Sequence, residues 1–197
     1  MNRLPAILLC LLWALPGSAS AQVQSYRVDA IVFLNKAASS ELGRPVALPD
    51  LSRAIDPANV RALAAAGIRI LPESQFALET EWKRLSNSAR HEPLLRLAWV
   101  QKQPPAERGP MIQVRLGQEL SVVSPNGQLL QTAPVEGSLG LMLGRFLHLE
   151  ADLVYTQPGD GGYITYRLSE RRRMRRDELH YLDSPRLGVL ARVVKAD

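Results

Sequence analysis

The spacing of apolar residues predicts a strand near the start of the chain. Between residues 26 and 34, every second position is apolar on one face, which carries Val28, Ala30, Val32 and Leu34. The other face is partly apolar too, because Ile31 and Phe33 lie on it. A strand that can bury both faces is typical of the middle of a sheet. Residues 35–49 carry Gly, Ser and Pro without periodicity, which predicts a loop.

Two helices are predicted next. Asp56 followed by Pro57 has the form of an N-cap with proline at the first helical position, and Gly67 ends this short helix. The second helix is predicted over residues 73–89. Its apolar positions recur at helical spacing and should form the buried face, with Leu78, Trp82 and Leu85.

From residue 93 onward the apolar period changes to two. Alternation over residues 95–99 and 112–116 predicts two strands, which we expect to be antiparallel neighbours. Between them, residues 104–110 are rich in proline. A connection of this kind is more typical of a surface loop than of a domain boundary.

The leucines of residues 139–153 predict a β-hairpin that turns at Gly144 and Arg145. One face of it should be apolar, while the other carries His148, Glu150 and Asp152. Turn signals at residues 125–127 and 160–162 separate this hairpin from further strands. The second half of the chain therefore has the pattern of an antiparallel meander.

These elements predict an α+β fold, in which an antiparallel β-sheet is covered by the two helices from the first half of the chain. A chain of 197 residues is long enough to bury a core without disulfides. We expect residues 22–197 to form a single domain.

The first 21 residues have the pattern of a secretory signal peptide. Arg3 precedes an apolar stretch over residues 7–15 that is too short to span a bilayer, and the segment ends in a small-x-small pattern at Ala21. We expect a Sec-type signal cleaved after Ala21 and an exported chain without a membrane span. The only cysteine, Cys10, lies in this leader, so the mature chain should have no thiol, disulfide or lipid anchor.

The formal net charge is +5, which is mild and predicts no nucleic-acid partner. The basic residues are nevertheless concentrated near the end of the chain, at Arg171, Arg172, Arg173, Arg175 and Arg176. Burying so many guanidinium groups would require a partner for each, so this run is expected on the surface.

Alternation of side chains along a strand gives the run a geometry. It directs one set of arginines to a single face, where they would form a basic ridge of Arg167, Arg171, Arg173 and Arg175. The preceding hairpin offers alternative partners in His148, Glu150 and Asp152, which would make the arginines a cross-strand network. The two interpretations are compatible, because three side chains cannot neutralise the whole row.

The same end of the chain resembles the CsiV family of periplasmic peptidoglycan-binding proteins. The resembling residues are 172–174, 178–183, Pro185 and 188–190, together with an opening strand that contains Tyr26, Val28, Ile31, Val32 and Phe33. The segments 97–101 and 144–149 are also similar to that family. The resemblance therefore spans both ends of the mature chain.

This resemblance implies a periplasmic protein that binds peptidoglycan and supports cell-wall synthesis. It also implies a protein partner, a lipoprotein regulator that activates a bifunctional penicillin-binding protein. The chemistry is consistent with the implied ligand, because arginine forks suit the carboxylates of stem peptides and aromatic faces suit the glycan. The alternative is an envelope adaptor that contacts other proteins and has no direct glycan binding.

Three further residues adjoin the arginine run and are candidates for ligand contact, namely His180, Tyr181 and Asp183. They lie before Pro185 in a predicted turn, so Asp183 could equally initiate the turn while His180 and Tyr181 pack beneath it. The candidate binding set thus comprises these three residues and the four ridge arginines.

No enzyme is predicted. The three histidines, His91, His148 and His180, lack the spacing of short metal-binding motifs. Neither a nucleophile elbow nor an S-x-x-K pattern is present. Scattered acids are usually a solvated surface, so a wall hydrolase with two carboxylates is disfavoured. We expect no cofactor and no metal.

Overall fold

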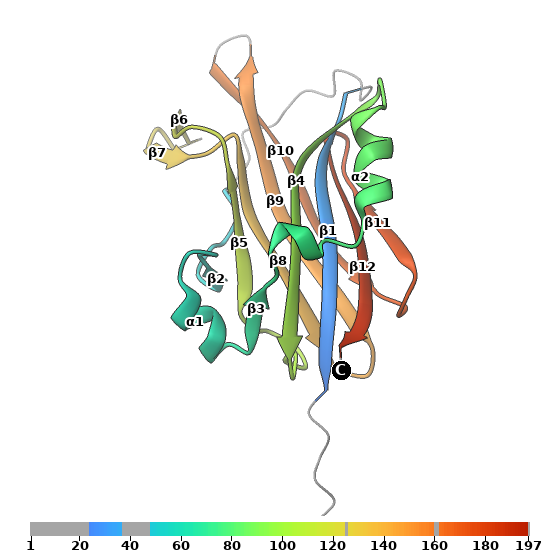
Figure 1. The fold of residues 1–197 in the computed structure, drawn as a ribbon. Helices are drawn as coiled ribbons and strands as arrows, with labels where there is room; N and C mark the ends of the chain where they lie inside the picture. The colour runs from blue at the N-terminus through green and yellow to red at the C-terminus, as the bar shows by residue number, and fades with distance from the viewer. Residues whose placement is uncertain (1–23, 37–47, 125, 160–161, 197) are drawn as a thin grey trace, which may run out of the picture.

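The computed structural model describes residues 24–36, 48–124, 126–159 and 162–196. The predicted leader lies outside these residues, as do most of the predicted loop over residues 35–49 and most of the turn at 160–162. The described chain consists mainly of β-strands, which form two five-stranded sheets and a small two-stranded hairpin (Figure 1).

The first sheet contains both ends of the described chain, and we call it the terminal sheet. Its strand order is β11-β12-β1-β4-β3 and every pairing in it is antiparallel. The strands are β1 (Ser25–Asn35), β3 (Ile68–Ile70), β4 (His91–Lys102), β11 (Leu179–Asp183) and β12 (Leu187–Ala196). The strand predicted over residues 26–34 occupies its middle, as its two apolar faces indicate.

The second sheet is built around consecutive hairpins, and we call it the meander sheet. Its order is β10-β9-β8-β5-β2, antiparallel except for the short β2–β5 pairing. The strands are β2 (Ala54–Ile55), β5 (Met111–Leu116), β8 (Val135–Leu143), β9 (Leu147–Gly159) and β10 (Gly162–Arg173). Strands β6 (Leu120–Val123) and β7 (Leu129–Thr132) form the separate hairpin.

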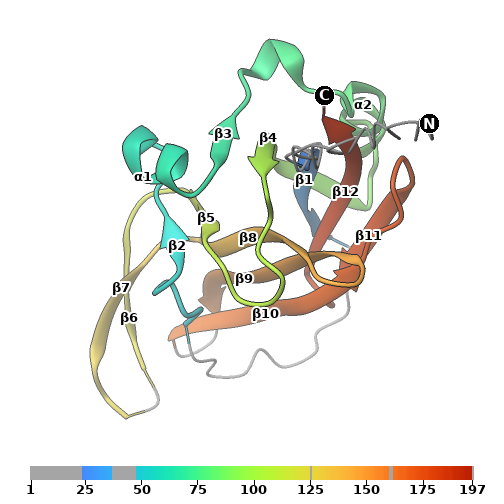
Figure 2. The same ribbon diagram turned by 90° about the horizontal axis from the view of Figure 1, so that it is seen from below.

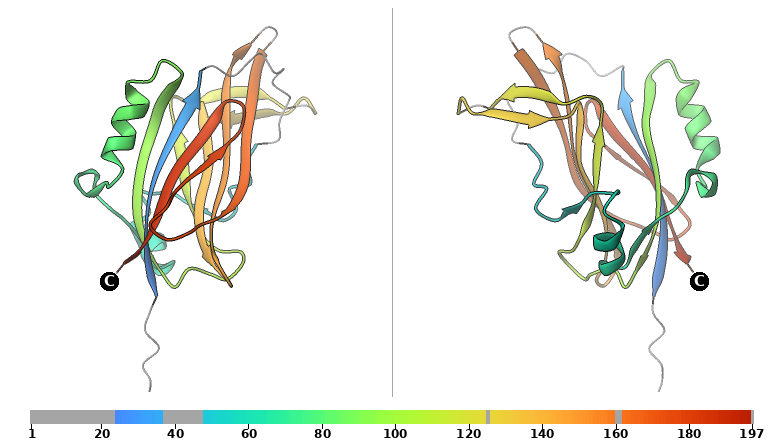
Figure 3. Two further views of the ribbon diagram at one scale, coloured as in Figure 1. Left: turned by 90° about the vertical axis from the view of Figure 1, so that its right-hand side faces the viewer. Right: turned by 60° about the vertical axis from the view of Figure 1, so that its left-hand side comes forward.

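The two sheets face each other, and the core lies between them (Figures 2 and 3). Trp99 of the terminal sheet and Ile112 and Leu149 of the meander sheet belong to one cluster of fully buried side chains. Burial of each such side chain contributes about 1.5–3 kcal/mol. Gln101 is buried at 1% exposure, and its amide Nε2 donates to the carbonyl of Leu141 across the two sheets (3.4 Å).

The first helix begins later than predicted. Helix α1 spans Val60–Ala65 and its N-cap is Asn59, whose Oδ1 accepts a hydrogen bond from the N–H of Ala62 (3.1 Å). The carboxylate of Asp56 instead accepts from the N–H of Ala58 (2.8 Å) and forms a turn before the helix. Asp56 and Asn59 are both good capping residues, and the one nearer the apolar stripe caps the helix.

The second helix is shorter than predicted. Residues Glu73–Gln75 form a 3₁₀ turn, and α2 spans only Glu79–Ser86. Between them the chain is held extended against the terminal sheet, because the N–H of Ala77 donates to the buried carboxylate of Asp29 (2.8 Å). Helix α2 lies beside β4 on the outer side of the terminal sheet, with Leu78 fully buried beneath it (Figure 3).

The antiparallel meander of the second half is confirmed, including the hairpin in which Leu143 pairs with Leu147. The prediction that β4 and β5 are neighbours is wrong. Strand β4 pairs with β1 and β3, whereas β5 pairs with β8 and β2. Both edges of β4 are thus occupied, so the proline-rich residues between β4 and β5 carry the chain from one sheet to the other.

Candidate functional site

The predicted ridge ends where strand β10 ends. Alternation holds as far as Arg173, so Arg167, Arg171 and Arg173 share the outer side of β10, opposite the buried Leu168. Arg175 lies in the connection between β10 and β11. The chain leaves the strand at Met174, which is buried and whose N–H donates to the carbonyl of Leu147 (2.9 Å).

Two of the ridge arginines are held by acids of the neighbouring strand. The guanidinium of Arg167 donates twice to the carboxylate of Asp152 (2.7 and 2.8 Å), and these hydrogen bonds are the main cause of its raised pKa. Arg171 donates to one oxygen of Glu150 (3.2 Å), while the other oxygen accepts from Arg53 (2.8 Å). The cross-strand interpretation is thus confirmed for Arg167 and Arg171.

Arg173 has a different environment. Its guanidinium carbon lies 3.4 Å from the centroid of the Phe146 ring, and that of Arg145 lies 5.3 Å from the same ring. Among the described residues, neither arginine forms an ion pair with a carboxylate. We call Arg145, Phe146 and Arg173 the arginine–phenylalanine cluster.

The register of two hairpins assembles this cluster. Pairing of Leu143 with Leu147 confines Arg145 and Phe146 to the tight turn between β8 and β9. Pairing of Arg173 with His148 places the last residue of β10 beside that turn. His148 helps to fix the turn through a hydrogen bond between its Nδ1 and the carbonyl of Phe146 (3.0 Å).

The cluster has the properties of an anion-binding surface. A guanidinium stacked on an aromatic ring keeps its N–H groups directed outward along its edge, where they can donate to a carboxylate. Nearby acids form ion pairs with other arginines: Glu170 with Arg172 (2.8 Å) and Glu178 with Arg175 (3.8 Å). The cluster therefore retains positive charge that these acids do not neutralise.

Arg175 and His180 serve to close a turn. The backbone N–H of Arg175 donates to Nε2 of His180 (2.9 Å), which requires the imidazole to be neutral with its proton on Nδ1. Asp177 in the same connection has a φ of 65°, and its N–H donates to the carbonyl of Val193 (2.9 Å). The predicted turn at these residues is wrong, because His180 lies in strand β11 (Leu179–Asp183) and bonds to Arg175, whose exposed guanidinium faces solvent.

Tyr181 and Asp183 lie on the opposite side of the molecule from the ridge. Both alternate with the buried Leu182 on β11, so they point to the outer side of the terminal sheet. The Tyr181 ring stacks on Phe33 with 5.8 Å between centroids, and burial, followed by the charge of Asp183, raises the pKa of the phenol. The structure therefore does not bring the seven predicted residues together into one site.

Sequence reasoning missed Arg145 and Phe146 as site residues. The sequence shows a turn at this position, but the distance between that turn and the arginine run depends on the register of β9 against β10. That register places Arg173 opposite His148, two residues beyond Phe146. The sequence did contain a signal for this site, namely an aromatic residue next to an arginine in a turn between two apolar strands.

The residues that the structure describes contain no group of three or more His, Cys, Asp or Glu side chains suited to a metal ion. Within the same described ranges, every helix is too short or too polar to cross a bilayer.

The described chain is thus a mainly antiparallel two-sheet fold with a cationic, aromatic cluster on its surface. The chain belongs to the CsiV family: the family model described as "Peptidoglycan-binding protein, CsiV" matches residues 4–196, nearly the whole chain. Comparisons with curated proteins and with solved structures found no match. Membership of a peptidoglycan-binding family indicates a periplasmic or envelope location.

Proposed function

We propose that the chain binds peptidoglycan in the periplasm without catalysing a reaction, and that the arginine–phenylalanine cluster is its main contact with the polymer. The observation that carries this proposal is the pair of guanidinium groups, on Arg145 and Arg173, that share the Phe146 ring and have no carboxylate partner among the described residues. Stem peptides supply carboxylates for these groups.

Of the predicted ridge, Arg173 belongs to the cluster, and Arg171 and Arg175 extend it. Their side chains are 50% and 75% exposed, and each forms a single contact with its carboxylate, at 3.2 and 3.8 Å. Ion pairs of this kind contribute about 1 kcal/mol or less, so an incoming carboxylate can compete for both arginines. Arg167 takes no part, because Asp152 already satisfies its fork.

The affinity of the surface depends on the ligand being a polymer. Each exposed arginine contact contributes about 1 kcal/mol or less, which alone gives only weak binding. A sacculus repeats its carboxylates, so several arginines and many protein molecules can engage it together. Weak individual contacts then give stable retention on the wall.

The remaining parts of the proposal rest on family membership and on the sequence. A signal peptide cleaved after Ala21 would deliver a single domain of residues 22–197 to the periplasm. There the protein would support cell-wall synthesis together with a lipoprotein activator of a bifunctional penicillin-binding protein. Bound to the wall, it would hold that partner near its substrate.

The purified mature chain is expected to pellet with protein-free peptidoglycan sacculi, with no other protein present. Because exposed charges make the contact, raising the salt from about 50 mM to about 500 mM should lower the bound fraction by about threefold or more. The measurement is co-sedimentation followed by quantification of pellet and supernatant. Absence from the pellet at low salt would favour the adaptor alternative, and release of soluble muropeptides would contradict a non-catalytic role.

A further inference from the structure

Strand β3 leaves one row of its backbone groups without a strand partner. The N–H of Lys102 donates to the carbonyl of Gly67, and the N–H of Leu71 donates to the carbonyl of Ala98 (both 2.8 Å). Hydrogen-bonded residues alternate in an antiparallel ladder, so the N–H and C=O groups of Ile68 and Ile70 point away from β4. The terminal sheet has no strand beyond β3 in the part of the chain that the structure describes.

An apolar cavity of about 370 Å³ adjoins this free edge. It lies between α1 and β3, and its apolar lining consists of Pro57, Val60, Leu63, Ala64, Ile68 and Ile70. Val60 is 70% exposed, a large value for an apolar residue on a helix that packs against a sheet. The volume is in the range of sites that bind ligands or side chains of a partner.

The rim of the cavity is cationic. Arg69 and Lys102 contribute to its lining, and no carboxylate does. Within the described ranges, neither side chain forms an ion pair. An apolar hollow between two unpaired cations complements a segment that combines apolar and acidic residues.

We propose that β3 and α1 form a docking site for an extended segment of a partner protein, in which apolar residues alternate with acidic ones. The segment adds to the terminal sheet as a strand beside β3 and bonds to the free groups of Ile68 and Ile70. Its apolar side chains enter the cavity beside Val60 and Leu63, while its carboxylates meet Arg69 and Lys102.

The charges distinguish this occupant from two others. A second copy of this chain, pairing edge to edge at β3, would bring Arg69 against Arg69, and charged edge residues commonly oppose such self-association. A glycan strand has N-acetyl amides, but it has neither a peptide backbone to pair with a sheet edge nor apolar side chains to fill the cavity. A polypeptide with alternating acidic and apolar residues can bond to the backbone groups of β3, fill the cavity and pair with the two cations.

Two blocked hexapeptides test the site, one alternating valine with glutamate and the other alternating valine with lysine. The valine–glutamate peptide is expected to bind the mature chain at least about tenfold more tightly than the valine–lysine peptide, as measured by fluorescence anisotropy with labelled peptides. Methylation of its alternate backbone nitrogens on the bonding edge should weaken binding by a similar factor, because the methylated amides cannot donate to β3.

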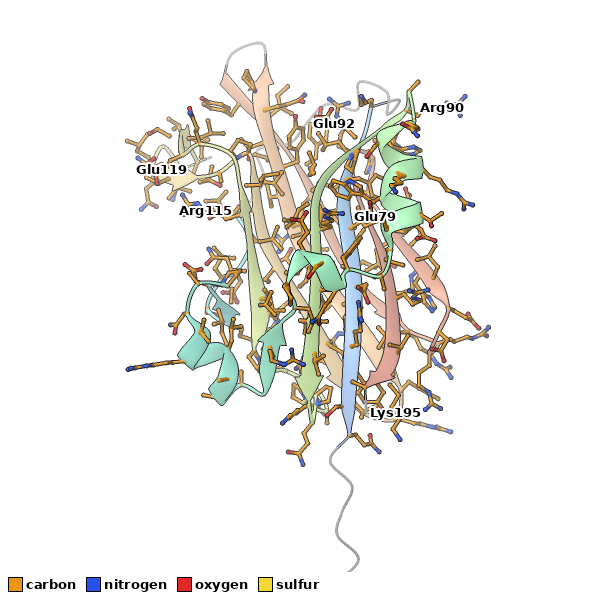
Figure 4. All side chains as sticks on the ribbon, viewed as in Figure 1. Glu79, Arg90, Glu92, Arg115, Glu119 and Lys195 are labelled. Carbon is orange, nitrogen blue, oxygen red and sulfur yellow. The ribbon has the colours of Figure 1, made fainter. Side chains whose placement is uncertain are left out.

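Variants of the protein test whether the peptide binds between α1 and β3. Val60→Glu changes an exposed side chain and should weaken binding of the valine–glutamate peptide at least about tenfold. The double variant Arg69→Glu with Lys102→Glu should reverse the preference, so that the lysine peptide becomes the better ligand. Arg90→Glu is the control for charge reversal elsewhere on the surface, because Arg90 is exposed near the far end of α2, away from α1 and β3 (Figure 4).

Reversed preference in the double variant, with unchanged binding by Arg90→Glu, supports the proposal. Equal binding of the methylated peptide, an unchanged preference in the double variant, or no binding of the valine–glutamate peptide at millimolar concentration would each overturn it. Sacculus pelleting by the same variants should stay at the wild-type level, so this site can fail without affecting the proposed contact with the wall.

Discussion

Replacing Arg145 and Arg173 together with glutamate is expected to reduce retention of the mature chain on sacculi at least about tenfold at low salt. Each lost guanidinium contact contributes about 1 kcal/mol, and two carboxylates in their place repel those of the stem peptides. Co-sedimentation over a range of sacculus concentrations measures the change. The substitutions should leave the fold intact, because both side chains lie on the surface and neither takes part in an ion pair among the described residues.

A matched control keeps the change in net charge the same. Arg84→Glu combined with Arg90→Glu alters two exposed arginines in and beside α2, far from the β8–β9 turn (Figure 4). This variant should pellet nearly as well as the wild type. Equal losses in the two double variants would mean that net charge alone governs retention, and would remove the special role of the cluster.

Gly137→Ala is expected to destabilise the fold by more than about 4 kcal/mol, an exceptional cost for one methyl group. Gly137 lies in β8 with a φ of +154°, and a Cβ at this position would be 2.0 Å from the carbonyl oxygen of Asp152 and 2.7 Å from the Cα of Leu153. Both contacts are with the backbone of β9, so a change of side-chain rotamer cannot relieve them.

Thermal unfolding followed by circular dichroism measures this effect, and the Tm should fall by roughly 8 °C or more if the variant folds at all. Gly127→Ala is the control, because Gly127 also has a positive φ (+81°) but a Cβ there would meet nothing within 4 Å. It should cost only about 1–2 kcal/mol. A Gly137→Ala variant as stable as Gly127→Ala would contradict the close approach of β8 and β9.

The sequence predicts individual strands well because the apolar spacing within each strand shows which of its faces is buried. Alternation of Leu147 and Leu149 with His148 and Glu150 appears in the structure as one buried and one half-exposed face. The central place of β1 follows in the same way from its two apolar faces. These features depend only on the alternation of successive side chains between two faces, which holds in any strand.

The division into two sheets could not be predicted in this way. Strands β4 and β5 have the same period and follow each other in the chain, yet they belong to different sheets. Pairing is decided by contacts between distant segments, such as β1 with β12 at opposite ends of the described chain. The first residue of α1 could not be predicted from the local sequence either, because both Asp56 and Asn59 are suitable N-cap residues.

For the candidate site, the alternation of side chains predicted that Arg167, Arg171 and Arg173 share one side of a strand. Partners for Arg167 and Arg171 were predictable, since Glu150 and Asp152 alternate on the adjacent strand. The position of Arg173 over Phe146 was not, because it depends on the hairpin register. Tyr181 could not be separated from the ridge without knowing that β11 belongs to the other sheet.

The most direct test of carboxylate recognition alters the ligand and leaves the protein unchanged. Sacculi whose carboxylates have been coupled to methylamine by a carbodiimide keep their glycan but lose the anions that the arginines are proposed to bind. We expect the mature chain to pellet with untreated sacculi at low salt and to remain largely in the supernatant with amidated ones. Equal pelleting with both preparations would contradict carboxylate recognition by Arg145 and Arg173.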